Sequence, residues 1–90
     1  MTYYYVGDIP HEVLTVLPEL NGVPQELHGN DSAEVTATNP SGTEITTLTA
    51  EVHANAIDVT FPETSIFTEA GIYTIVCIID HTEHHEIVAA

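Results

Sequence analysis

The stretch from Phe67 to Asp80 constrains the fold more than any other part of this sequence, because its residues predict a corner followed by one long buried β-strand. Gly71 supplies the corner, since a residue without a Cβ turns the chain at little steric cost. From Tyr73 to Ile79, five of the seven residues are β-branched. That composition favours a strand over a helix, so the chain is expected to be built around this strand.

Both faces of the predicted strand are apolar at its centre. Successive side chains of a strand point to opposite faces, which gives a first face made of Tyr73, Ile75, Cys77 and Ile79. If this face packs on the core, Val76 and Ile78 point away from it, where a solvent-facing strand normally carries polar residues. We expect Val76 and Ile78 to be covered, either by a partner protein or by the tyrosines near the start of the chain.

Turn sequences divide the remaining chain into short runs with strand-like alternation. Asn21-Gly22 and Asn39-Pro40-Ser41-Gly42 are such turns. The other predicted strands, in chain order, are Thr2–Val6, Val13–Leu17, Val23–His28, Ala33–Thr38, Thr43–Thr49, Ile57–Phe61 and His84–Ala89. Residues 33–38 and 43–49 are expected to form a hairpin. Seven to eight short strands at this spacing predict an all-β fold, an antiparallel β-sandwich that forms one domain over residues 1–90. Cys77 is the only cysteine, so the sandwich has no internal disulfide.

The charge balance is the second unusual feature. The chain has 14 acidic residues and no lysine or arginine, for a formal net charge of −14. Such a chain cannot neutralise phosphates, which argues against nucleic acids and anionic membrane surfaces as partners. Its carboxylates have no lysine or arginine within the chain, so their repulsion must be relieved by salt, by protons or by a basic partner. The missing cations also suit a salt-adapted, halophilic source.

The region from His81 to Glu86 holds the only dense cluster of metal-type ligands in the sequence. His81 and His84 could converge across a hairpin with Glu83 or Glu86 as a third ligand. The spacing fits no named zinc motif, and we expect a solvated hairpin tip without a metal or other cofactor. The chain also lacks a Gly-x-Ser-x-Gly elbow, a glycine-rich phosphate loop and a His-Glu-x-x-His helix, so we expect no enzymatic activity.

The corner sequence Glu69-Ala70-Gly71-Ile72-Tyr73 resembles the entry to strand F of immunoglobulin-like domains. In those domains a tyrosine near the strand start bonds its hydroxyl back to upstream backbone, which implies a structural role for Tyr73 and Gly71. Antibody-type domains place a cysteine two residues later, where this chain has Ile75, and the chain has no tryptophan. The resemblance is therefore to disulfide-free, bacterial or viral immunoglobulin-like modules.

A narrower resemblance covers most of the chain. Four segments occur in an order similar to small immunoglobulin-like accessory proteins of tailed-phage heads, necks and tails: Tyr5-Val6-Gly7-Asp8, Asn21-Gly22-Val23-Pro24, Val35 to Thr43, and Gly71-Ile72-Tyr73. The absence of basic residues departs from that family. The resemblance implies a non-enzymatic virion protein, made in the host cytoplasm. It would bind capsid, neck or tail proteins as a capsid decoration or head–tail subunit, as a homo-oligomer or in many copies.

Tyr3, Tyr4 and Tyr5 join Val76 and Ile78 as the expected partner interface. Three consecutive tyrosines of a strand cannot all face one way, so at least one ring should be exposed or lie at an interface. The alternative function is a cell-surface or carbohydrate-binding module that uses these rings as a sugar platform. The start of the chain has no basic region or apolar signal core, which counts against that alternative.

Overall fold

The computed structural model describes residues 2–20, 23–24, 33–53, 55–79 and 81–90, and within these ranges the chain is all-β, without a helix. The strands are β1 (Thr2–Tyr3), β2 (Leu14–Val16), β3 (Glu19–Leu20), β4 (Val23–Pro24), β5 (Ala33–Thr38), β6 (Glu44–Ile45), β7 (Thr49–His53), β8 (Ala56–Thr60), β9 (Ile72–Ile79) and β10 (Thr82–Ala89). The two longest, β9 and β10, have eight residues each.

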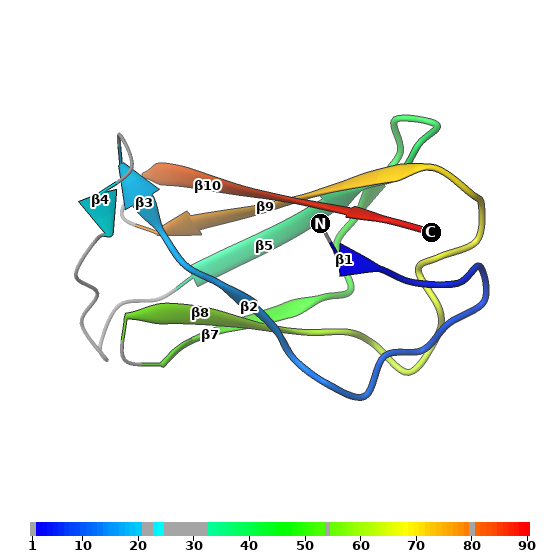
Figure 1. The fold of residues 1–90 in the computed structure, drawn as a ribbon, viewed down its shortest axis with the longest axis horizontal. Helices are drawn as coiled ribbons and strands as arrows, with labels where there is room; N and C mark the ends of the chain where they lie inside the picture. The colour runs from blue at the N-terminus through cyan, green and yellow to red at the C-terminus, as the bar shows by residue number, and fades with distance from the viewer. Residues whose placement is uncertain (1, 21–22, 25–32, 54, 80) are drawn as a thin grey trace.

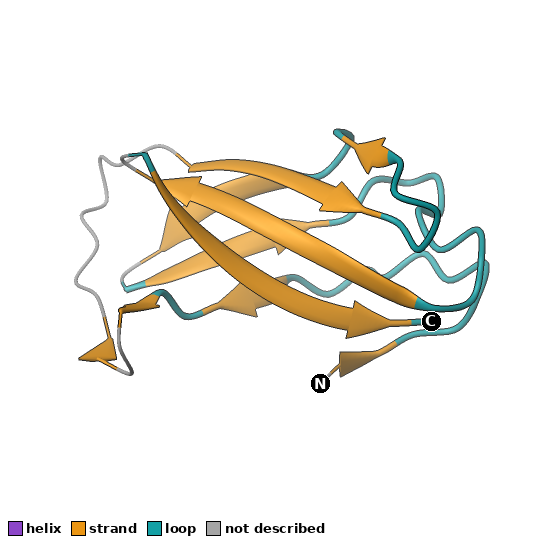
Figure 2. Ribbon diagram, turned by 90° about the horizontal axis from the view of Figure 1, so that it is seen from above, coloured by secondary structure: helices purple, strands orange, loops and turns teal. Residues whose placement is uncertain are grey.

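Two sheets pack face to face (Figures 1 and 2). One has the strand order β1-β10-β9-β5-β6 and the other β2-β8-β7, while β3 and β4 pair separately. The described pairs are antiparallel except for β1, which runs parallel to β10. This is an immunoglobulin-like β-sandwich with eight described strands in its two sheets, which confirms the predicted fold class. The predicted central strand is β9, which is bonded to β10 on one side and to β5 on the other.

The core lies between the two sheets and is formed by the inward faces of their strands. On β9, the residues Tyr73, Ile75 and Cys77 are fully buried and Ile79 is nearly so, as the alternation predicts. Opposite them, the inward side chains of β8 are also buried. Fully burying one such side chain stabilises the fold by about 1.5–3 kcal/mol, so the inward rows of β8 and β9 both contribute to the core.

The corner before β9 has the geometry that the sequence predicts for Tyr73. Its hydroxyl donates a hydrogen bond to the backbone carbonyl of Glu69 at 2.7 Å and accepts one from the Glu69 N–H at 3.2 Å. Gly71 has a φ of 139°, in the region that favours glycine. A Cβ at this position would lie 2.8 Å from Cγ of Pro40, so a larger residue would also clash with the turn between β5 and β6.

Two predicted strands are shorter in the structure than in the sequence analysis, and a third is described only in part. The predicted strand Thr2–Val6 ends at Tyr3, because the Asp8 N–H bonds back to the Tyr5 carbonyl and Gly7 turns the chain with a φ of 90°. Val13–Leu17 is reduced to β2. Within Val23–His28 only β4 is described, and the Asn21-Gly22 turn and residues 25–28 lie outside the described residues.

The predicted strand Thr43–Thr49 divides between the two sheets. Its first part, β6, forms the expected hairpin with β5 through the pairs Ala37–Ile45 and Thr38–Glu44. Its last residue, Thr49, begins β7 of the other sheet. Leu48, just before that strand, is only 5% exposed, so this crossing is anchored by an apolar side chain in the core. The run has only two apolar residues, Ile45 and Leu48, which are too few to show where the chain leaves the sheet.

Candidate functional site

The outer face of the five-stranded sheet carries an apolar stripe over its two longest strands. On β9, residues 72, 74, 76 and 78 point away from the core. The register places Val76 opposite His85 of β10, and Thr74 opposite Ile87. We call Ile72, Val76, Ile78 and Ile87 the outer stripe. Ile72 and Ile87 are 50% and 37% exposed, and the other two are half-buried among their neighbours.

Acidic side chains flank one end of the outer stripe. Ile78 lies between Glu34 of β5 and Glu83 of β10, which are its partners on the two sides. Both glutamates are exposed. One row along, Val76 lies between Thr36 and His85. The stripe is therefore an apolar surface with a polar and negatively charged border.

Tyr3 lies at the opposite end of this face. The parallel pairing of β1 with β10 places Tyr3 beside Ala89, and its side chain is 76% exposed. Val76 lies opposite His85, which precedes Ala89 by four residues on β10. His85 and Ala89 are therefore roughly 13 Å apart along the strand. Tyr3 therefore extends the outer stripe near Ile72 rather than covering Val76.

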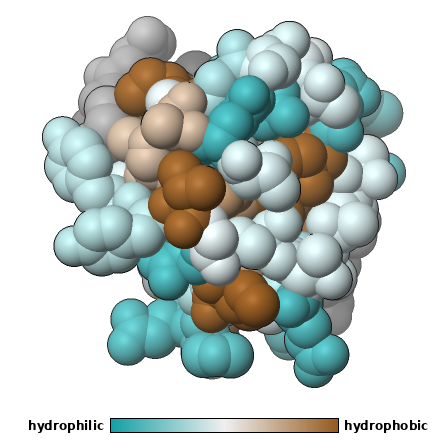
Figure 3. Space-filling model, turned by 90° about the vertical axis from the view of Figure 1, so that its right-hand side faces the viewer, coloured by the Kyte–Doolittle hydropathy of each residue, from teal (hydrophilic) through white to brown (hydrophobic). Residues whose placement is uncertain are grey.

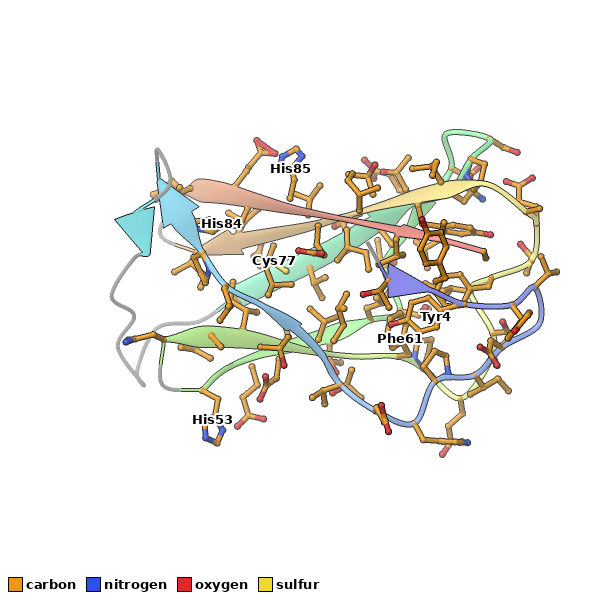
Figure 4. All side chains as sticks on the ribbon, in the orientation of Figure 1. Tyr4, His53, Phe61, Cys77, His84 and His85 are labelled. Carbon is orange, nitrogen blue, oxygen red and sulfur yellow. The ribbon has the colours of Figure 1, made fainter. Side chains whose placement is uncertain are left out.

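Tyr4 does not lie on this surface, and this corrects its assignment to the partner interface. Its ring stacks on Phe67 with centroids 4.6 Å apart and meets Phe61 edge-on at 5.5 Å (Figure 4). Burial raises the pKa of the Tyr4 hydroxyl, and the negative charges of Asp8 and Glu12 raise it further. The prediction failed because alternation alone does not show which side of a terminal strand meets the core. Tyr5 is 83% exposed, so the three adjacent rings do not form one platform.

The outer face of the three-stranded sheet differs in chemistry from the outer stripe. Its central row consists of Thr15, Asp58 and Glu51, which are paired across β2, β8 and β7. The next row pairs Thr49 with Thr60, and both are exposed. These polar rows are what a solvated sheet face normally carries. The exposed apolar residues of this sheet, Val13 and Leu17, lie just before and just after β2 rather than within a strand.

The end of the sandwich near the Gly71 corner provides a further comparison. Figure 3 views the molecule from that side and shows hydrophobic side chains as separate areas among hydrophilic ones. Scattered exposed apolar residues are usual on a soluble protein, whereas a contiguous row along a strand indicates a binding surface.

The histidines and glutamates of β10 lie on different sides of the strand. His84 and Glu86 are half-buried and face inward, whereas Glu83 and His85 are exposed (Figure 4). His81 lies in the turn before the strand with a φ of 64°. Nε2 of His85 is 3.8 Å from a carboxylate oxygen of Glu83. Within the described residues, no three His, Cys, Asp or Glu side chains converge as metal ligands. The candidates His81, His84 and Glu86 are therefore not brought together.

The buried thiol of Cys77 also has a defined chemical state. Its pKa is raised to about 11, first by burial and then by the negative charge of Glu86. A thiol with this pKa is protonated at neutral pH and is a poor nucleophile, so Cys77 acts as a small apolar core residue.

Sequence reasoning missed two members of the surface. The sequence analysis does not include Ile72 in the expected interface, and it places Ile87 within the strand His84–Ala89 without assigning it to a face. Alternation with the buried Val88 indicates that Ile87 points outward. Its neighbours on the sheet, however, follow only from the pairing of β10 with β9.

The chain matches no protein-family model, and neither the curated proteins nor the solved structures show a significant similarity to it. In the described part of the chain, no helix has the length and apolar character that crossing a membrane requires.

Proposed function

We propose that this protein is a non-enzymatic structural subunit that binds neighbouring proteins through its outer stripe. The assembly suggested by the sequence resemblance is a virion, in which the protein decorates the capsid or lies at the head–tail region. An immunoglobulin-like sandwich whose central strand is paired with β10 along its length and with β5 from Thr74 to Ile79 is consistent with such a role, but the fold alone does not assign it.

The contrast between the two outer faces supports this proposal most directly. The strands of one sheet present Thr, Glu and Asp to solvent, whereas the other presents Val76, in the middle of β9, and Ile78, near its end. Leaving these aliphatic groups in water costs about 25 cal/mol for each Å² of apolar surface. Covering the stripe with a partner recovers that free energy.

The charges around the stripe indicate the chemistry of the partner. Glu34 and Glu83 border Ile78, and the chain has no lysine or arginine to pair with them. The partner surface should therefore have an apolar centre and lysine or arginine side chains near its rim. Such rim charges mainly speed association and select the partner, while the apolar centre supplies most of the affinity.

The test compares Ile78→Asp with Thr60→Asp in purified virus particles. Thr60 is exposed on the polar outer face, so its variant adds the same charge away from the stripe. The unpaired carboxylate in Ile78→Asp would be buried by a partner, at a cost of several kcal/mol. We expect both variants to fold alone, but only Thr60→Asp to be found in particles at the wild-type copy number by quantitative mass spectrometry.

Two results would contradict the proposal in different ways. If the wild-type protein is missing from purified particles, the virion setting is wrong. If Ile78→Asp is incorporated as well as Thr60→Asp, the outer stripe is not the docking surface. Thermal unfolding of each isolated variant distinguishes lost binding from lost folding.

A further inference from the structure

In the part of the chain that the structure describes, the edge of β10 that faces away from β9 has no partner strand over most of its length. β1 pairs with β10 only at Val88 and Ala89. Among the described strands, none pairs with Thr82–Ile87 on that side. A free edge of six residues is long enough for another extended chain to add to the sheet.

The hydrogen bonds at the end of β10 show which backbone groups are available. Gly71 and Ala90 exchange two bonds, at 2.9 and 3.0 Å, so Ala90 directs its N–H and C=O toward β9. In an antiparallel pair these directions alternate, so residues 83, 85, 87 and 89 direct theirs to the other side. The Ala89 carbonyl does accept a bond there, from the Tyr4 N–H at 2.8 Å. The parallel pair Thr2–Val88 likewise uses the outward carbonyl of Ile87. Within the described residues, both outward groups of Glu83 and His85 and the N–H of Ile87 are therefore left without a partner strand.

This edge opens onto a groove between the two sheets. Residues 15–17, in and just after β2, and residues 83–86 of β10 line a groove of about 440 Å³. Leu17 in this groove is 66% exposed, and the inward side chains of His84 and Glu86 are half-buried. A strand added along β10 would direct alternate side chains into this groove and cover Leu17.

The charges select the kind of strand that can occupy this edge. Glu83 lies on the outer side of β10 and Glu86 on the groove side, so both faces of an added strand would meet a carboxylate. The chain itself has no lysine or arginine, so a second copy cannot supply the complementary charge. We propose that β10 binds an extended, lysine- or arginine-containing segment of another protein as an added β-strand along Thr82–Ile87. Backbone hydrogen bonds would supply the pairing, and the acidic residues the selectivity. This edge does not depend on the outer stripe, so either proposal can fail alone.

The test measures amide hydrogen exchange by NMR in the full chain at low salt. The probe is an end-capped octapeptide of alternating lysine and valine. The control is the same peptide with every backbone amide methylated, which keeps the charges and removes the donors. We expect the octapeptide to slow exchange about tenfold at Glu83, His85 and Ile87, and to leave the amides of His84 and Glu86 unchanged because they already bond to β9.

Two variants test the same edge. His85→Pro removes one outward N–H at a position where an edge strand tolerates proline, and His85→Val removes the imidazole but keeps the N–H. We expect about fivefold weaker peptide binding for His85→Pro, the effect of one lost hydrogen bond, and little change for His85→Val. Equal binding of the methylated peptide, or no protection at the three outward amides of the wild-type chain, would overturn the proposal. If His85→Pro unfolds, the exchange pattern of the wild-type chain still tests the proposal.

Discussion

Tyr73 shows at the scale of one residue how a side chain can define a corner of the fold. Its ring is fully buried beside Phe67, with centroids 5.0 Å apart, while its hydroxyl uses both backbone groups of Glu69. The ring therefore belongs to the core, and the hydroxyl ties the preceding loop to the start of β9. Gly71 complements this contact because it allows the chain to pass close to Pro40.

Replacing Tyr73 with phenylalanine should destabilise the protein while leaving the ring in place. The change leaves the N–H and C=O of Glu69 without their partner, which should lower the free energy of unfolding by about 1–3 kcal/mol. Urea unfolding measures the effect, and Tyr5→Phe is the control because Tyr5 is exposed. An unchanged midpoint for Tyr73→Phe would show that the hydroxyl does not support the corner.

At the scale of elements, the two-residue strand β1 of the large sheet depends on a residue that follows it. β1 has two residues, which is too short to be stable through its own pairing. The next residue, Tyr4, bonds its N–H to the Ala89 carbonyl and inserts its ring between Phe61 and Phe67. This aromatic contact explains how so short a strand is held against β10.

Truncating Tyr4 should therefore detach β1 from the sandwich. We expect Tyr4→Ala to lower the free energy of unfolding by about 2 kcal/mol, less than the 3–5 kcal/mol typical of fully buried aromatic residues, because Tyr4 is half-buried. Tyr5→Ala should change it by less than about 0.5 kcal/mol. Chemical denaturation compares the two variants, and equal losses would mean that the ring of Tyr4 does not anchor the strand.

At the scale of the whole molecule, charge repulsion should dominate the response to salt. Fourteen acids without a lysine or arginine lie on a molecule of 34 × 25 × 19 Å. The Debye length is about 30 Å at 0.01 M salt and about 10 Å at 0.1 M. At the lower concentration nearly all the carboxylates repel one another, and at the higher one only near neighbours do. Glu51 and Asp58 are such neighbours, directly opposite on β7 and β8.

We expect the melting temperature at pH 7 to rise steeply between 0.01 and 0.3 M sodium chloride because screening weakens this repulsion. Glu51→Gln should raise it at low salt, by relieving a cross-strand pair of like charges, and this gain should shrink as salt is added. Glu63→Gln, in an exposed loop, is the matched control. A flat or falling salt dependence in scanning calorimetry would refute the repulsion argument.

The amino-acid sequence by itself determined the features that depend on neighbouring residues. The β-branched run and its period of two placed Tyr73, Ile75, Cys77 and Ile79 on the core side of β9. Glycine and the corner tyrosine located the turn before that strand. These signals are local, because backbone preference and side-chain alternation act within a few residues.

The tertiary structure decided which surfaces those elements present. It turned Tyr4 into the core, moved the chain to the second sheet after β6, and placed Ile87 beside Thr74 on the outer face. Among the described strands, it also left the outward N–H groups of Glu83, His85 and Ile87 without a partner. Each of these outcomes depends on contacts between segments far apart in the chain, where several pairings satisfy the same local pattern. Among these pairings, the one that buries the most apolar surface is the most stable and is therefore selected.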